Sequence, residues 1–191
     1  MRILGIDPGL RSTGWGVITI DNGRMAHVAN GAVQPPPRLD DGARLKQIHD
    51  HLGVVIAQHR PDCAAIEQIF VAKSAASALR LGMARGVGVL ACADAGLAVA
   101  EIAARAVKKA VVGSGGADKA QVQDMVRRLL AVEPFNADAA DALAIAIAAS
   151  NDAGKPVSGA VRSAQSGVTG GLSAAIAAAL ARDDAGKGTP E

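Results

Sequence analysis

Two carboxylates in this sequence stand where an apolar segment gives way to a turn. Asp7 ends the apolar run at residues 2–7 and is followed at once by Pro8-Gly9, and Glu67 ends a second apolar run at residues 63–67. A carboxylate held at a strand end suits a metal ligand or a general base, although Asp7 also fits an Asx-type turn in which it only bonds the backbone. If the two runs are neighbours in one sheet, the acids meet, and a divalent cation would remove their repulsion.

Two further carboxylates, Asp138 and Asp141, open an otherwise apolar helix expected at residues 137–150. They are three positions apart and so share one helix face. The helix dipole alone would explain Asp138, but a buried acid such as Asp141 needs a cation or a firm hydrogen bond. We therefore expect four acids to converge on Mg²⁺ or Mn²⁺ in a metal-dependent phosphoryl-transfer site: Asp7, Glu67, Asp138 and Asp141.

Aromatic side chains are scarce, at 2% of the chain with no tyrosine, so each one outside the core needs a reason. Phe70 follows Glu67 by three residues and fits a base-stacking role, although a core position is the more common one for phenylalanine. Lys108 and Lys119 flank a glycine-rich loop and fit phosphate contacts, although either alone would be an ordinary surface lysine.

The formal net charge of +2 says little until it is located along the chain. Residues 73–128 hold nine basic and four acidic side chains, whereas residues 129–191 hold four basic and seven acidic ones. A positive middle segment next to a carboxylate site is typical of a polyanion-binding surface, and solvated helix faces are the alternative.

The periodicity predicts an α/β fold with a mixed five-stranded sheet flanked by helices. An Asp21-Asn22-Gly23 turn joins the second and third strands, so the first three strands are expected to be antiparallel. The strands are predicted at residues 2–7, 14–20, 25–33, 63–67 and 97–102, and the helices at 39–59, 74–95, 105–112, 118–130 and 137–150.

The composition predicts one domain over residues 1–150, a flexible linker over 151–171, and a C-terminal helix with a disordered tail over 172–191. Cys63 and Cys92 lie in apolar surroundings without metal-ligand spacing, which indicates thiols in a reducing compartment. No signal-like segment and no apolar run of about 18 residues is evident. We therefore expect a cytoplasmic protein without a membrane partner.

Taken together, the motifs resemble those of the RuvC family of Holliday junction resolvases over about residues 1–150. The matching segments are GIDPGL at 5–10, TGWG at 13–16, IEQIFVAK at 66–73, SAL at 77–79, LGMARG at 81–86, VVG at 111–113, KAQV at 119–122 and DAADALA at 138–144. The family's usual C-terminus lies soon after the last of these, so the resemblance implies nothing about residues 151–191.

The resemblance implies an RNase H-like fold, a homodimer and a Mg²⁺-dependent endonuclease that makes paired nicks in four-way DNA junctions during recombination and repair. It implies two Mg²⁺ ions per site, with Mn²⁺ as a substitute, and a branch-migration motor complex as a partner. The implied catalytic and metal-binding residues are Asp7, Glu67, Asp138 and Asp141. The implied DNA contacts are Phe70, Lys73, Arg80, Lys108 and Lys119.

Two alternatives share the glycine-rich start of the chain. One is another RNase H-like nuclease of the YqgF type, and the other is an actin-like or sugar-kinase ATPase, which would need a second phosphate loop. The helix at 74–95 also has two interpretations, because Gly82, Gly86 and Gly88 suit either a close dimer interface or packing against the chain's own sheet.

Overall fold

The computed structural model describes residues 1–68, 74–132 and 136–151. The chain divides into two units, Met1–Val161 and Arg162–Glu191, and all described residues belong to the first. Residues 152–191, which include nearly all of the predicted linker and terminal segment, lie outside the described residues. The elements in order are β1 (Arg2–Asp7), β2 (Thr13–Asp21), β3 (Arg24–Val33), α1 (Asp41–His59), β4 (Cys63–Glu67), α2 (Ala75–Asp94), β5 (Val99–Ile102), α3 (Ala104–Val112), α4 (Lys119–Leu130) and α5 (Ala137–Ser150).

The five strands form one mixed sheet in the order β3-β2-β1-β4-β5. β2 pairs antiparallel with β1 and β3, whereas β4 pairs parallel with β1 and β5, so the predicted architecture is confirmed. Asn22 and Gly23 both have positive φ, 48° and 77°, as a tight hairpin turn requires. The predicted element ends differ by one or two residues; α1, for example, begins at Asp41 because Asp40 caps it by accepting a hydrogen bond from the Ala43 N–H.

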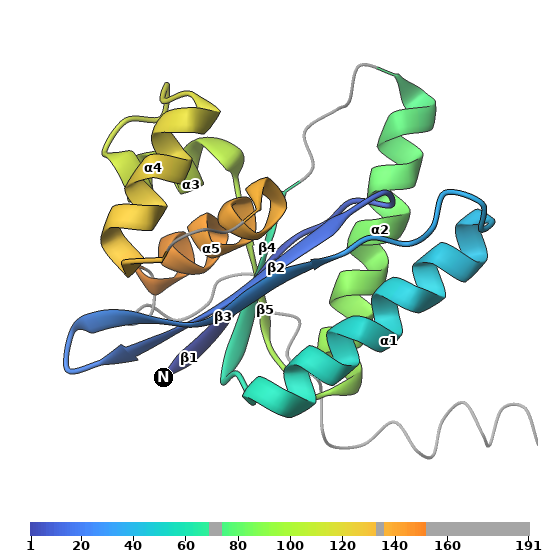
Figure 1. The fold of residues 1–191 in the computed structure, drawn as a ribbon, viewed down its shortest axis with the longest axis horizontal. Coiled ribbons are helices and arrows are strands. Elements are labelled where there is room, and N and C mark those ends of the chain that lie inside the picture. The colour runs from blue at the N-terminus through green and yellow to red at the C-terminus, as the bar shows by residue number, and fades with distance from the viewer. Residues whose placement is uncertain (69–73, 133–135, 152–191) are drawn as a thin grey trace, which may run out of the picture. The chain divides into compact units, whose positions relative to one another are not determined.

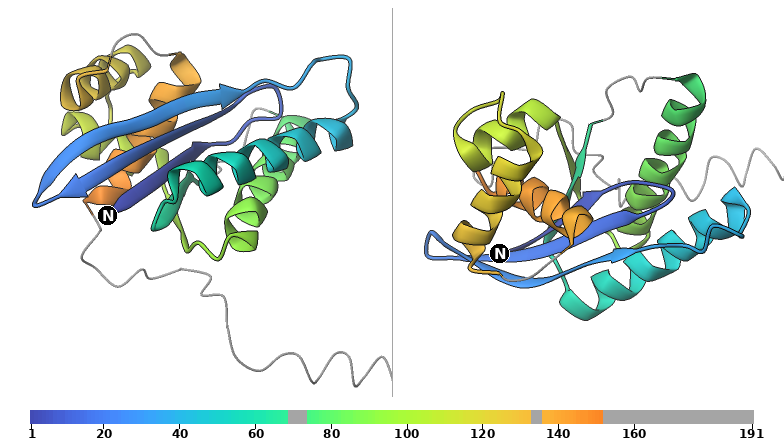
Figure 2. Two further views of the ribbon diagram at one scale, coloured as in Figure 1. Left: turned by 60° about the horizontal axis from the view of Figure 1, so that its bottom comes forward. Right: turned by 45° about the horizontal axis from the view of Figure 1, so that its top comes forward.

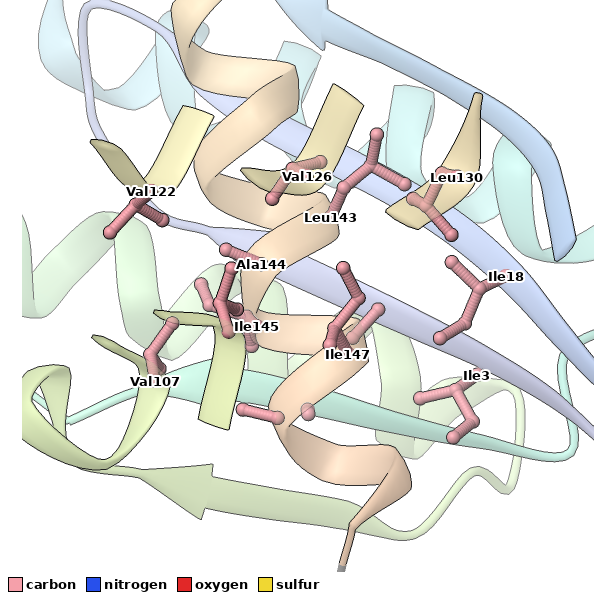
Figure 3. Packing of buried hydrophobic residues seen from close by; sticks show 14 of the residues in the cluster. Ile3, Ile18, Val107, Val122, Val126, Leu130, Leu143, Ala144, Ile145 and Ile147 are labelled. Atoms are coloured by element: carbon pink, nitrogen blue, oxygen red, sulfur yellow. The ribbon is translucent and has the colours of Figure 1, made fainter. Parts of the chain in front are cut away.

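Helices cover both faces of the sheet (Figures 1 and 2), with α1 and α2 on one face and α3, α4 and α5 on the other. Each face has its own apolar cluster. The cluster under α5 joins Ile3 and Ile18 to the buried sides of α3, α4 and α5 (Figure 3). The other cluster packs Leu4, Ile6 and Val17 against α1 and α2. Alternate residues of β1 therefore face opposite layers.

Helix α5 lies so close to the sheet that only glycine fits beneath it. A Cβ on Gly5 would overlap the carbonyl oxygen of Ala142, and one on Gly14 would overlap that of Asp138. A Cβ on Gly16 would lie 2.7 Å from the Leu143 side chain. The helix meets these glycines with a nearly uninterrupted run of buried alanine, leucine and isoleucine. The backbone of α5 is thus set directly over β1 and β2.

Among the described helices, α2 alone is long and apolar enough to cross a membrane by length and composition. Its mean hydropathy is 1.2 over an 18-residue window, of which 22% is buried. This differs from the sequence expectation that no apolar run approaches that length. A single such helix is weak evidence for a membrane span, since helices in soluble proteins also meet these criteria.

We expect Gly5→Ala to lower the free energy of unfolding by about 1–3 kcal/mol or more, because the added methyl group forces α5 away from β1. Gly53→Ala is the matched control: a Cβ on this exposed glycine of α1 would meet no atom within 4 Å, so alanine should stabilise the helix by about 0.5–1 kcal/mol. Urea unfolding of both variants measures the two changes. Equal stability of Gly5→Ala and the parent protein would contradict the close packing of α5.

Candidate active site

Side chains alternate between the two faces of the sheet along β1 and β4, and this alternation places Asp7 and Glu67 on the same face. Ile3 and Gly5 of β1 face α5, so Asp7, two residues further, faces the same way. In β4, Cys63 and Ala65 pack on the α5 side, and Glu67 continues that series. The parallel register pairs Ile6 with Ile66, which makes Asp7 and Glu67 neighbours at the carboxyl end of the two strands. The predicted meeting of these two acids is confirmed.

The start of α5 brings the other two carboxylates to the same edge, with Asp138 in its first turn and Asp141 one turn further on. Asn136 caps the helix by accepting a hydrogen bond from the Ala139 N–H. Beside it, the Ser12 hydroxyl donates a 2.5 Å hydrogen bond to Oδ2 of Asp138. Ser12 belongs to the short loop between β1 and β2, so this bond ties the start of α5 to the loop that follows Asp7.

The closeness of the four acids has electrostatic consequences. Burial, together with the charges of Asp141, Glu67 and Asp138, raises the pKa of Asp7 from 3.8 to about 7, while Lys119 opposes the shift. Burial, followed by the charge of Asp141, also raises the pKa of Glu67. Near neutral pH, Asp7 is therefore protonated in a substantial fraction of molecules, because it is largely removed from water and lies among other acids.

Two lysines from the layer of α3 and α4 reach this cluster. Lys119 Nζ lies 2.5 Å from Oδ2 of Asp141, and that hydrogen bond raises the pKa of the lysine. Lys119 is the first residue of α4, whose start is held by a capping box between Asp118 and Gln121. Lys108 of α3 lies near enough to Glu67 for its charge to lower the pKa of that acid. The structure thus brings both predicted lysines to the carboxylates.

The donor set fits a hard divalent cation in its chemistry. Four carboxylates supply only oxygen ligands, and the raised pKa of Asp7 reflects its burial and then its repulsion by the other acids, which a cation would relieve. Within the described ranges, however, no three acidic, histidine or cysteine side chains are already arranged to hold a metal. Ser12 engages one oxygen of Asp138, and Lys119 engages one oxygen of Asp141.

The remaining predicted DNA contacts differ in their outcome. Arg80 of α2 is exposed and lies 3.8 Å from Asp41 at the start of α1, so this ion pair does not involve the four acids. Phe70 and Lys73 lie outside the described residues. The predicted contacts of these three residues with DNA stay predictions.

Ser12 is a site residue that the sequence reasoning missed. Its loop is closed by Thr13, whose buried hydroxyl donates to the Gly9 carbonyl at 2.8 Å and accepts from the Gly9 N–H at 3.2 Å. The available signal was position: Ser12 and Thr13 are hydroxyl residues in the turn that directly follows Asp7. Nothing in the sequence pattern pointed to Asp138 as the partner.

Comparison with known proteins places this site in a family. The family model described as "Crossover junction endodeoxyribonuclease RuvC" matches residues 3–149. The RuvC of Maricaulis maris is 56% identical over 147 residues, which cover 77% of this chain and 89% of the relative. That of Rhodopseudomonas palustris strain TIE-1 is 56% identical over 148 residues, covering 77% of this chain and 85% of the relative.

A solved structure agrees with the fold. Thermus thermophilus RuvC in complex with a Holliday junction substrate superposes with a TM-score of 0.75 at 31% identity, covering 80% of this chain and 94% of that one. The mixed sheet with helices on both faces is therefore the RNase H-like fold that the sequence resemblance implied.

We expect Asp7→Asn to stabilise the metal-free protein at pH 8. The pKa of Asp7 is about 7 in the folded protein and near 3.8 when unfolded, so folding becomes less favourable as pH rises from about 4 to 7, by at most about 4 kcal/mol. Asparagine removes this penalty, so the variant's advantage should be full above pH 7 and vanish below pH 4. Urea unfolding with chelator at pH 4, 6 and 8 measures it.

The control for this pH series is Asp21→Asn, which changes an exposed carboxylate at the hairpin end of the sheet. Its stability difference from the parent protein should not grow with pH. An Asp7→Asn advantage that stays constant from pH 4 to 8 would contradict the raised pKa of Asp7.

Proposed function

This chain belongs to the RuvC family of crossover junction endodeoxyribonucleases, and on that premise we propose that it resolves four-way (Holliday) DNA junctions by paired symmetric nicks. The observation that carries the proposal is the meeting of Asp7, Glu67, Asp138 and Asp141 at one sheet edge beside two lysines. Family membership decides against the YqgF-type nuclease and the ATPase that the sequence left open.

The reaction is the hydrolysis of a phosphodiester. A water oxygen bonds to phosphorus while the bond from phosphorus to the 3′ oxygen breaks, which leaves a 5′ phosphate and a 3′ hydroxyl. Two Mg²⁺ ions, or Mn²⁺ in their place, would activate the water and stabilise the leaving oxygen. The residues that would hold them are Asp7, Glu67, Asp138 and Asp141.

The chain's own groups prepare the site for that chemistry. Asp7 must lose its proton to act as a ligand, and its raised pKa makes this loss dependent on pH near neutrality. Ser12 fixes the orientation of Asp138 by its hydrogen bond. Lys119 neutralises Asp141, and with a cation bound by that acid the lysine would be available for a phosphate of the substrate.

Further DNA contacts extend from this centre. We assign Lys108 and Lys119 to backbone phosphates beside the scissile bond, because both lie among the acids that would hold the ions. Arg80 is exposed at the start of α2 and is assigned to the junction arms. Phe70 is assigned to stacking on an unpaired base and Lys73 to a phosphate, both from the family resemblance.

A homodimer would place one such site on each of two opposed strands. Helix α2 carries a stripe of exposed small and apolar residues on one face, formed by Leu79, Gly82, Gly86 and Leu90, of which the two leucines are 66% and 52% exposed. Gly88 and Ala84 face the sheet instead, where a Cβ on Gly88 would lie 3.3 Å from Ile66. The exposed face of α2 is thus the one available for a dimer interface, whereas Ala84 and Gly88 pack against the chain's own sheet.

Two other expectations stay predictions from the sequence. A branch-migration motor complex as partner follows from the family resemblance. A cytoplasmic location follows from the cysteine environment and from the substrate proposed here.

The cleavage test uses the purified protein with a synthetic four-way junction, linear duplex, flap DNA and an RNA–DNA hybrid, in Mg²⁺ or chelator. We expect paired symmetric nicks in the junction alone, and none in chelator. Asp7→Asn and Glu67→Gln should each lower the cleavage rate at least about 10³-fold, since each removes a charged ligand, while junction binding persists. Asp21→Asn should cut like the parent protein. Equal cutting of linear duplex would overturn the junction assignment.

The dimer test substitutes the exposed stripe of α2. A two-fold interface presents each residue twice, so Leu90→Glu would bring two buried carboxylates together and should raise the dimer dissociation constant at least about tenfold. Leu129→Glu is the matched control, because Leu129 is 46% exposed but lies on α4. Sedimentation velocity measures both variants. A Leu90→Glu protein that dimerises as tightly as the control would show that α2 is not the interface.

A further inference from the structure

An open cavity of about 610 Å³ lies beside the catalytic edge of the sheet and has no role in the mechanism above. It is formed by three separate segments: the loop after β1, the loop after β3 and the first turn of α1. Its lining residues are Arg11, Gln34, Pro35, Pro36, Pro37 and Arg44.

The sheet topology explains why this cavity lies near the carboxylates. β3 is antiparallel to β2, which is antiparallel to β1, so β1 and β3 end at the same edge. The loop at residues 34–40 and the start of α1 therefore sit at the edge where Asp7 emerges. A chain of two hydrogen bonds makes the link, because Gln34 Nε2 contacts Ser12 Oγ at 3.5 Å and Ser12 donates to Asp138.

The two arginines leave the cavity with positive charge that the protein does not neutralise fully. Arg44 is 13% exposed, and its Nε is buried without a hydrogen-bond partner among the described residues. Its nearest carboxylate, Asp41, lies 4.0 Å from Nη1 and is shared with Arg80 at 3.8 Å. Arg11 is exposed and follows directly on the Gly9-Leu10 turn. Arg11 and Arg44 thus line the cavity with guanidinium groups that have little carboxylate nearby, and such groups favour an anionic ligand.

The rest of the lining narrows the class of that ligand. Three consecutive prolines form one wall and offer no backbone N–H, so the arginines and the Gln34 amide are the donors available. Arginine binds phosphate oxygens through parallel N–H groups, and the proline rings give the cavity an apolar wall against which a sugar could pack. A phosphate diester with its deoxyribose matches both features.

We propose that this cavity holds a backbone phosphate of the DNA strand being cut, one or a few nucleotides from the scissile bond. Lys108 and Lys119 belong to α3 and α4, which cover one face of the sheet (Figure 2). Arg44 belongs to α1 on the opposite face, and Arg11 lies in the loop between β1 and β2. The DNA strand would thus contact basic side chains on both sides of the carboxylates. This inference rests on the proposed function, because it names where that same substrate runs.

The test measures binding of a synthetic four-way junction in the Asp7→Asn background, which prevents cutting, over a series of NaCl concentrations. Arg11→Gln and Arg44→Gln should each weaken binding about three- to tenfold and reduce the slope of log affinity against log salt by about 0.9, the value for one phosphate contact. Arg44→Lys should keep most of the slope. Arg24→Gln, at the exposed hairpin end of the sheet, is the charge-matched control and should bind like the background protein.

A second measurement locates the contact. Junctions with one neutral methylphosphonate at a time near the cleavage point should reveal a position that weakens the Asp7→Asn protein but not its Arg44→Gln derivative. A melting-temperature check shows whether Arg44→Gln is folded, and Arg11 is exposed, so its variant tests the cavity without that concern.

Several outcomes would overturn the inference. Unchanged slopes for both arginine variants, with junction binding intact, would refute the cavity assignment alone. Inorganic phosphate that raises the melting temperature of the parent protein but not of Arg44→Gln, with equal junction binding, would assign the cavity to a small free anion instead. Absence of junction binding in every variant would refute the proposed function and this inference with it.

Discussion

The close approach of α5 to the central strands is the constraint on which the rest of the structure depends. Glycines at 5, 14 and 16 have no side chains to hold the helix away from the sheet. The alanines of α5 are small as well, so its backbone lies close to β1 and β2. This contact buries α5 almost completely and fixes its first turn over the end of β1. The positions of Asp138 and Asp141 relative to Asp7 are consequences of backbone packing rather than of any bond between the acids themselves.

That packing brings together groups that repel one another, and the fold compensates only in part. Ser12 satisfies one oxygen of Asp138, and Lys119 neutralises Asp141, but Asp7 is buried among acids without a cation of its own among the described side chains. Burial, and then repulsion by these acids, raises its pKa to about 7. A site that is locally unfavourable to folding is where a bound cation adds the most stability, since it binds only the folded arrangement. On the proposed function, the grouping of acids that would bind metal is also the grouping that lowers stability without it.

Much of this arrangement could be predicted from the sequence, because it follows from short-range rules. The odd-numbered positions of the first strand lead to Asp7, those of the fourth lead to Glu67, and a parallel pairing makes the two acids neighbours. The partners of Asp138 and Asp141 could not be predicted, because Ser12 and Lys119 reach them through loop geometry and side-chain choice across more than 20 residues. The three prolines indicated only a break in the chain, and the cavity they wall needs residues from two other segments.

The arrangement of charges at this sheet edge explains how a chain with a net charge of only +2 could bind a polyanion. β1, β3, β4 and β5 all end there, and α1 and α2 begin there, so loops from both faces of the sheet meet at one line. Acids occupy the centre of that line, where strands end, and cations occupy the helices and loops on either side. Overall charge then matters less than this alternation, because on the proposed function a phosphate backbone lying across the edge would meet cations on both sides of the acids.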